Sequence, residues 1–538
     1  MPIKEISEKE LDALIKRLEE AIENDLSITK EDMKLWFEIG MSFAYFQEQL
    51  SDNKVTLHKL KKLAGIVSSS EKLKKISGTE ESEKPKKLER EKKPEKEKKV
   101  VEHKVCHHKL EGLAKGDVCP KCEKGKLYKY EPAVTVRISG NSPLVSTQHI
   151  RERLRCNACG EYFTAELPKE VKDDGGEDNQ YTYSAKAIMA IYRYFGGLPL
   201  HRQESMGNLL GVPINASTIL DQTEHVANAG NVIFNYLKKL AGSAKSYQLD
   251  DTKNRIVGLD KEMIPNRKTG KLKERSGIYT SGIIAEIEGN YKIVLFKTNI
   301  GHAGEFIDEI LKGRDAHAPP PLIMSDALSS NKPSVINDYH LTLCNAHARR
   351  EFYDLYEHFP DKVEWVLNKY GKIWKNDDKC LGKTPEERLD YHKEHSLPIM
   401  KEIKTWGEKM LESKEVEENS AMGKAIKYFL KHYDGLSAFC NITDAKIDNN
   451  EMESMLKLII RGRKNSLFFK SQNGADIADV LTSLIATCQK QSVNSFDYLV
   501  QIQKHSDKVG KNPAQWLPWN YKDTLKAMDN EKQTVPSL

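Results

Sequence analysis

Long apolar runs are missing from this chain of 538 residues: no stretch is long enough to cross a bilayer, and the first residues lack the pattern of a signal peptide. These absences argue against a membrane protein, and we expect a cytoplasmic one without membrane contact. An excess of one sign of charge is also missing, because 84 basic and 79 acidic residues leave a net charge of only +5. Any affinity for nucleic acid must therefore come from local patches.

Cysteine is rare as well, and nine in so long a chain do not make a disulfide framework. Four of the nine form two Cys-x-x-Cys pairs, Cys119 with Cys122 and Cys156 with Cys159. Zinc prefers four soft or imidazole ligands in a tetrahedron, and each such pair supplies two thiolates from one tight turn. We predict one structural Zn²⁺ in a zinc ribbon, against the alternative of unrelated buried cysteines. A Cys-His-His run at 106–108 could replace one ligand.

The first third of the chain changes character twice. Up to about residue 68 the apolar spacing predicts a small helical bundle, whose apolar residues pack on each other or on a partner. Lysine and glutamate then dominate to about residue 100, which predicts a disordered linker, a solvated spacer more than a DNA contact. Residues 200–222 resemble a helix-turn-helix, but the second helix carries Asp221 and Glu224, so DNA contact and a packing role both remain open.

From residue 245 the apolar period becomes that of strands. The pattern predicts four strands, at residues 247–252, 276–287, 291–297 and 321–326, and a helix at 304–311. Asp250 and Asp251 lie in the first strand and Asp326 ends the last one, where acids face the ligand crevice of open α/β sheets. Because side chains alternate along a strand, Asp250 and Asp251 cannot both enter one site.

Another acidic group begins a predicted helix near residue 450, after the N-cap candidates Asp448 and Asn449. Glu451 is expected to complete a capping box with Asp448, which leaves Glu453 free to bind a metal. The helix ends in a basic cluster formed by Arg461, Arg463 and Lys464. We predict that this cluster holds DNA phosphates, and the alternative is that it only complements the C-terminal end of the helix.

Two aspartates on strands and a glutamate on a helix are what a two-metal phosphoryl-transfer site requires, since shared carboxylates hold two cations about 3.5–4 Å apart. At these residues the sequence resembles the transposases of the insertion-sequence-66 family, which belong to the DDE group with a ribonuclease-H-like core. The resemblance rests on motifs in a fixed order along most of the chain, among them Leu249-Asp-Asp-Thr252, Ser325-Asp326, Cys344-Asn-Ala-His-Ala-Arg-Arg350 and Ile447-Asp-Asn-Asn-Glu-Met-Glu453.

The resemblance implies that Asp250, Asp326 and Glu453 are the catalytic acids and hold two Mg²⁺ or Mn²⁺ ions. It selects Asp250 over Asp251, which the strand period alone does not. It further implies cleavage of DNA at the terminal inverted repeats of an element and transfer of the freed 3′-hydroxyl into target DNA. Expected partners are these DNAs, further copies of the chain and small accessory proteins of the element, in the bacterial nucleoid. The alternatives are a hydrolysing ribonuclease-H-like nuclease and a catalytically decayed zinc-containing DNA-binding protein.

The expected fold is a multi-domain α+β or α/β chain with a ribonuclease-H-like core interrupted by a helical insertion. The expected segments are an N-terminal helical region (1–68), a charged linker (69–100), the zinc ribbon (101–168), a helix-turn-helix-like region (175–242), the two parts of the core (243–358 and 446–505), the insertion between them (359–445) and a C-terminal tail (506–538).

The sequence departs from the family pattern where the family usually has Glu at Asp251, Gly at Ala327, Trp at Asn345 and Arg at Ser454. These changes leave the three acids in place. Cys344 and His347 have a Cys-x-x-His spacing that could bind metal, but no second pair accompanies them. We therefore favour a structural role for both.

Overall fold

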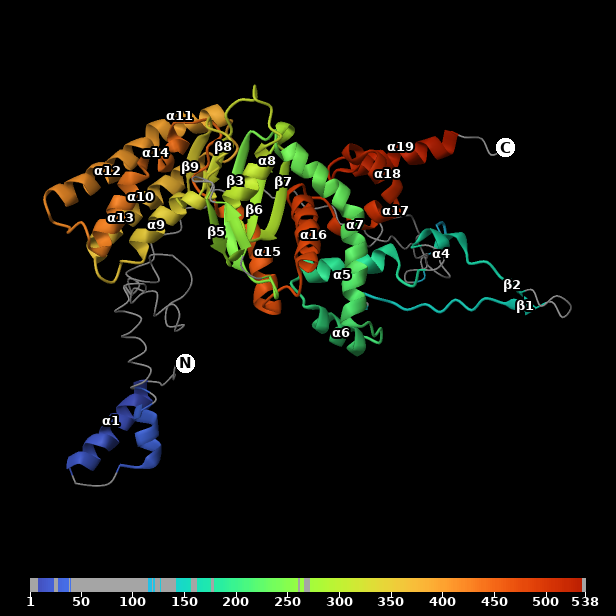
Figure 1. Cartoon of the computed structure of the whole chain (residues 1–538), viewed down its shortest axis with the longest axis horizontal. Helices are drawn as coiled ribbons and strands as arrows, with labels where there is room; N and C mark the ends of the chain where they lie inside the picture. Colours follow the sequence, from blue (N-terminus) through green and yellow to red (C-terminus); the bar gives the residue numbers. More distant parts are fainter. Residues whose placement is uncertain are drawn as a thin grey trace. The chain divides into compact units, whose positions relative to one another are not determined.

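The computed structural model describes residues 8–23, 28–37, 39, 115–118, 120, 126, 142–155, 162–175, 179–259, 262–265 and 271–534. The chain divides into two compact units, one of residues 1–69 with 143–538 and one of residues 70–142. The strands and helices that position the acids all belong to the first unit (Figure 1).

A five-stranded mixed sheet forms the centre of this unit, in the order β7-β6-β3-β8-β9. Antiparallel pairs join β3 to β6 and β6 to β7, whereas β3, β8 and β9 run parallel. The strands are β3 (Ser246–Asn254), β6 (Ile278–Glu286), β7 (Lys292–Asn299), β8 (Leu322–Ser325) and β9 (His340–Leu343). Four of them lie where the apolar period predicted strands, and β9 was not predicted. A separate hairpin, β4 (Glu262–Pro265) with β5 (Leu272–Arg275), was not predicted either.

The two faces of the sheet carry different layers. Helix α15 (Asn450–Ser466) packs on one face, where Met452 and Leu456 meet Ile284, Val294 and Phe296. The other face is covered by α8 (Ala303–Leu311) and α7 (Ala216–Ala241), in a larger core that also includes α5 (Tyr183–Tyr194) and α17 (Ser495–Lys504). Alternation along β3 therefore turns neighbouring side chains toward different helices.

Helix α16 (Gln472–Lys490) closes the sheet along its β7 edge, as Figure 1 shows. The backbone N–H groups of Val294, Phe296 and Thr298 donate to the side chains of Thr487 (3.1 Å), Ser483 (2.9 Å) and Asp479 (2.6 Å) respectively. The acceptors are four residues apart on the helix and the donors two residues apart on the strand. These spacings agree, because four residues of helix rise about 6.0 Å and two residues of strand about 6.6 Å. Helix side chains thus replace a sixth strand.

Helices fill the chain between β9 and α15, on the β8 and β9 side of the sheet (Figure 1). They are α9 (Asn345–Tyr353), α10 (Pro360–Lys379), α11 (Pro385–His395), α12 (Leu397–Glu412), α13 (Ala421–Lys431) and α14 (Tyr433–Leu436). Their contacts reach the segment before α15, since Trp374 donates to Asp448 at 3.0 Å and Arg388 to the carbonyl of Ala445 at 3.3 Å.

The helix-turn-helix-like segment forms α6 (Leu200–Leu209) and α7, and α7 continues for 26 residues. Its Ile219, Thr223 and Val226 are buried, and it packs on α5, α16 and α17. Helix α7 thus packs in the main core, and DNA contact by this segment stays a prediction. Beyond α17, the segment expected as a tail forms α18 (Ser506–Lys511) and α19 (Tyr521–Thr534), and Trp516 between them is buried in the main core.

The predicted zinc ligands Cys119, Cys122, Cys156 and Cys159 lie outside the described residues, and so does the linker predicted at 69–100. The described residues just before and just after each Cys-x-x-Cys pair form β-bridges with each other. Val118 forms an antiparallel bridge with Lys126, and β1 (Arg153–Arg155) pairs with β2 (Tyr162–Thr164). In the N-terminal region, α1 (Glu8–Glu23) and residues 30–37 are helical. In the part of the chain that the structure describes, no helix combines the length and apolarity needed to cross a membrane.

Candidate active site and metal cluster

Asp250 lies in the middle of β3, directly opposite Gly282 of β6. A side chain at Gly282 would meet the methyl end of Met452 and the ring of Phe296, so the missing Cβ lets α15 approach the sheet here. Met452 precedes Glu453 in the chain. The close approach therefore brings the helix that carries the third acid over the strand that carries the first.

Asp326 directly follows β8, the parallel neighbour of β3. Its Oδ1 accepts hydrogen bonds from the side-chain amide of Asn331 at 2.8 Å and from the backbone N–H of Leu328 at 3.2 Å. Asn331 is fully buried, so the loop after β8 holds this carboxylate in one orientation.

Glu453 lies in the first turn of α15, and buried Asn449 fixes where that helix starts. The side-chain amide of Asn449 donates to the carbonyl of Leu249 in β3 at 2.8 Å, and its backbone N–H donates to the thiol sulfur of Cys344 at 3.2 Å. Asn345 adds two bonds from its own backbone and side-chain nitrogens to the carbonyl of Ile447, at 3.1 and 3.0 Å. The start of α15 is thus tied to β3 and to α9.

Asp326 and Glu453 both act electrostatically on Asp250. Burial and the charges of Asp326, Glu453 and Asp251 together raise the pKa of Asp250 to about 7, although one backbone hydrogen bond from Asp251 lowers it. Like charges gathered in a partly buried place disfavour full ionisation unless a cation is present. The donor set consists of carboxylate oxygens, which suit Mg²⁺ and Mn²⁺.

Asp251 faces the opposite layer from Asp250. Its Oδ2 lies 2.9 Å from Nδ1 of His302, at the start of α8. This placement agrees with the alternation argument, which allows only one of the two aspartates on the α15 face.

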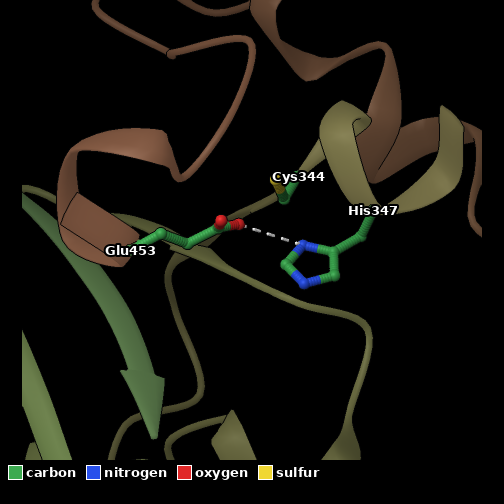
Figure 2. A group of neighbouring side chains, drawn as sticks. All are labelled: Cys344, His347 and Glu453. Atoms are coloured by element: carbon green, nitrogen blue, oxygen red, sulfur yellow. Dashed lines mark ion pairs between the residues drawn. The ribbon is translucent and has the colours of Figure 1, made fainter. Parts of the chain in front are cut away.

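The structure brings Cys344 and His347 to Glu453, which the sequence did not indicate. Cys344 precedes α9 and His347 lies in its first turn, so their spacing places both at the same end of the helix. The thiol, the imidazole and the carboxylate offer ligand atoms that all lie within 4.8 Å of one another. Figure 2 shows the imidazole and the carboxylate pointing toward each other, with His347 Nδ1 3.7 Å from Glu453 Oε1. The signal in the sequence was the Cys-x-x-His spacing, and the missing partner comes from residue 453.

The capping box predicted for Glu451 is wrong. Helix α15 has no side-chain cap, and the carboxylate of Glu451 instead accepts bonds from Lys292 (2.8 Å), Lys446 (2.7 Å) and Lys490 (2.9 Å). Burial alone would raise the pKa of Glu451, but the positive charges of Lys446 and Lys292 and their hydrogen bonds outweigh it and hold that pKa well below its ordinary value. The carboxylate thus pairs with three lysines, one just before α15, one in β7 and one in α16, in place of a local cap.

The basic cluster lies eight to eleven positions after Glu453, about 12–17 Å along the helix axis. Arg461 donates to the carbonyl of Phe195 at 2.8 Å, and Arg463 donates to the hydroxyl of Thr252 at 3.0 Å and to the carbonyl of Lys253. Lys464 is exposed. The two arginines therefore join α15 to neighbouring segments, whereas Lys464 points to solvent.

Comparison with known proteins places the chain in a family. Residues 179–477 match the family described as transposase IS66 family. Two similar proteins of Sinorhizobium fredii are both named only as uncharacterized. The protein y4jD is 30% identical over 34% of this chain and 36% of its own length, and y4hP is 24% identical over 69% of this chain and 67% of its own. The matches thus span between about one third and two thirds of those relatives. Because the family match extends over more than half of the chain, from α5 to α16, the chain belongs to the IS66 family of transposases.

Proposed function

We propose that this protein is a DDE transposase with a ribonuclease-H-like core, which cleaves DNA at the ends of its element and joins the freed 3′-hydroxyl to target DNA. The observation that carries the proposal is that Asp326, at the end of β8, and Glu453, in α15, lie near enough to Asp250 of β3 to raise its pKa, in a chain of a transposase family. The strand order, with β3 central between antiparallel β6 and parallel β8, supports such a core.

The three carboxylates would hold two Mg²⁺ ions. Such a pair of ions activates the attacking oxygen and stabilises the leaving oxygen of the phosphodiester. The protein itself would orient the three carboxylates. Asn331 holds Asp326, and Asn449 fixes the start of the helix that bears Glu453. Gly282 leaves room for that helix beside Asp250. The same geometry serves hydrolysis of the first strand and attack by the 3′-hydroxyl.

Replacement of single acids tests this proposal. Asp250→Asn, Asp326→Asn and Glu453→Gln should each reduce cleavage and joining of labelled element ends by at least about 100-fold, since each removes a charged metal ligand. Binding of the same DNA should persist in all three variants. Asp251→Asn is the matched control, because Asp251 faces α8, and it should retain most of the activity.

Two results would contradict the proposal in different ways. If Asp251→Asn is as inactive as Asp250→Asn, the assignment of Asp250 is wrong. If labelled ends are cut but never joined to target DNA, the protein is a hydrolysing nuclease.

A further inference from the structure

The cluster of Cys344, His347 and Glu453 adds a thiol and an imidazole to one carboxylate of the acid triad. Two of them, His347 Nδ1 and Glu453 Oε1, are buried and have no hydrogen-bond partner among the described residues. Buried polar atoms in folded proteins are nearly always hydrogen-bonded or bound to an ion or water. Two such atoms that face each other beside a thiol therefore require an explanation.

The chemistry of these donors selects the ligand. A thiol and an imidazole are soft or borderline donors, which favour zinc-class ions and disfavour Mg²⁺. Sites that combine Cys, His and carboxylate with three protein ligands leave a fourth position for water or another oxygen. The acid triad, by contrast, offers oxygen atoms alone.

The framework around the cluster is rigid on both sides. The backbone N–H of Cys344 donates to the carbonyl of Ser325 at 3.1 Å, and its sulfur accepts from the backbone N–H of Asn449 at 3.2 Å. The same Asn449 starts α15, which carries Glu453. The ligand atoms from α9 and α15 are therefore held close together by bonds that no ion has to supply.

We propose that Cys344, His347 and Glu453 bind one zinc-class divalent cation, at a site separate from the predicted zinc ribbon. Binding converts the thiol of Cys344 to a thiolate, and the displaced proton goes to solvent. Glu453 is then shared between this cation and the acid triad. The sharing depends on the proposed function, whereas the cation site depends only on the cluster.

Metal content tests the site in the full-length chain. Protein equilibrated with zinc and dialysed should lose one zinc equivalent per chain on Cys344→Ser, whatever the ribbon holds, because a serine hydroxyl is a poor zinc ligand. Cys440→Ser is the matched control: this thiol is also buried and burial also raises its pKa to about 12, but it lies outside the cluster. Its zinc content should equal that of the wild type.

A second measurement covers the case in which Cys344→Ser fails to fold. Cobalt(II) bound to a thiolate has charge-transfer absorption, and that part of the spectrum should weaken in His347→Ala and Glu453→Gln but not in Asp250→Asn. Unchanged zinc content and an unchanged cobalt spectrum in His347→Ala would overturn the site. This readout does not depend on DNA cleavage, so it separates failure of the site from failure of the proposed transposase activity.

Discussion

Asp479 is a buried acid outside the acid triad. It is 5% exposed and accepts bonds from the backbone and the hydroxyl of Thr298, at 2.6 and 2.7 Å. Burial raises its pKa to about 7, and the bonds from Thr298 lower it only in part. The folded protein therefore keeps the proton over a range of pH in which the unfolded chain has lost it.

This difference predicts a stability that falls as pH rises from about 4 to about 7, by at most about 1.4 kcal/mol per pH unit, and is flat above. Asp479→Asn should remove that component of the free energy of unfolding. Urea unfolding of both proteins at pH 5, 6 and 8 measures it. Asp221→Asn, which changes an exposed acid of α7, is the control and should keep the wild-type slope. Asp250 adds a component of the same sign, because its pKa is also about 7, so the slope should become shallower without disappearing. An unchanged slope in Asp479→Asn would show that Asp479 does not contribute.

Single residues also show what the sequence could not predict. Glu451 and Glu453 lie two positions apart, and local rules assigned the first to a cap and the second to metal. The actual partners of Glu451 are lysines at positions 292, 446 and 490, and those of Glu453 include a histidine at 347. Lys292 and His347 each lie more than a hundred positions from the acid they contact, and local spacing does not identify such a partner.

At the scale of elements, the basic end of α15 contains two residues with different expected roles: Lys464 contacts DNA, and Arg463 also joins the helix to β3. Lys464→Gln should lower the slope of log affinity against log salt by about 0.9 without lowering Tm, because one phosphate contact is lost. Arg463→Gln should lower Tm as well, since it also loses the bonds to Thr252 and Lys253. DNA binding at several salt concentrations, with thermal melting, distinguishes these effects.

Exposed Lys401 of α12 offers a control, because Lys401→Gln removes the same charge from another helix. If Lys464→Gln leaves the salt slope unchanged, this lysine does not contact DNA and is not one of the DNA-binding residues.

Elements were predicted best where burial alone determines the pattern. The strands that became β3, β6, β7 and β8 are apolar runs or alternations, and the structure has them close to the expected bounds. Strand β9 has only four residues, and its first, His340, is exposed. Four residues are too few to show the period of a strand, and at the edge of the sheet β9 pairs with β8 alone.

At the scale of the whole molecule, zinc and catalysis should separate. Cys119→Ser or Cys156→Ser should remove one zinc equivalent, because each removes a thiolate from a four-ligand site. The melting of the catalytic core should be unchanged, since its sheet and helices lie elsewhere in the chain. Metal analysis and calorimetry measure both. If the cation site at Cys344 exists as well, the double variant Cys119→Ser with Cys344→Ser should lose two equivalents, and wild-type protein without zinc would refute both sites.

The closure of β7 by α16 has a consequence for synthesis of the chain. The strand ends at residue 299, but the side chains that occupy its outer N–H groups begin at residue 479. A ribosome that has made the first 470 residues has therefore made a sheet with an open edge, and open edges pair with other chains. A messenger cut before codon 472 should yield aggregates, while the completed protein is protected. The synthesis of α16 thus sets the moment at which the β7 edge of the nascent chain is closed to other chains.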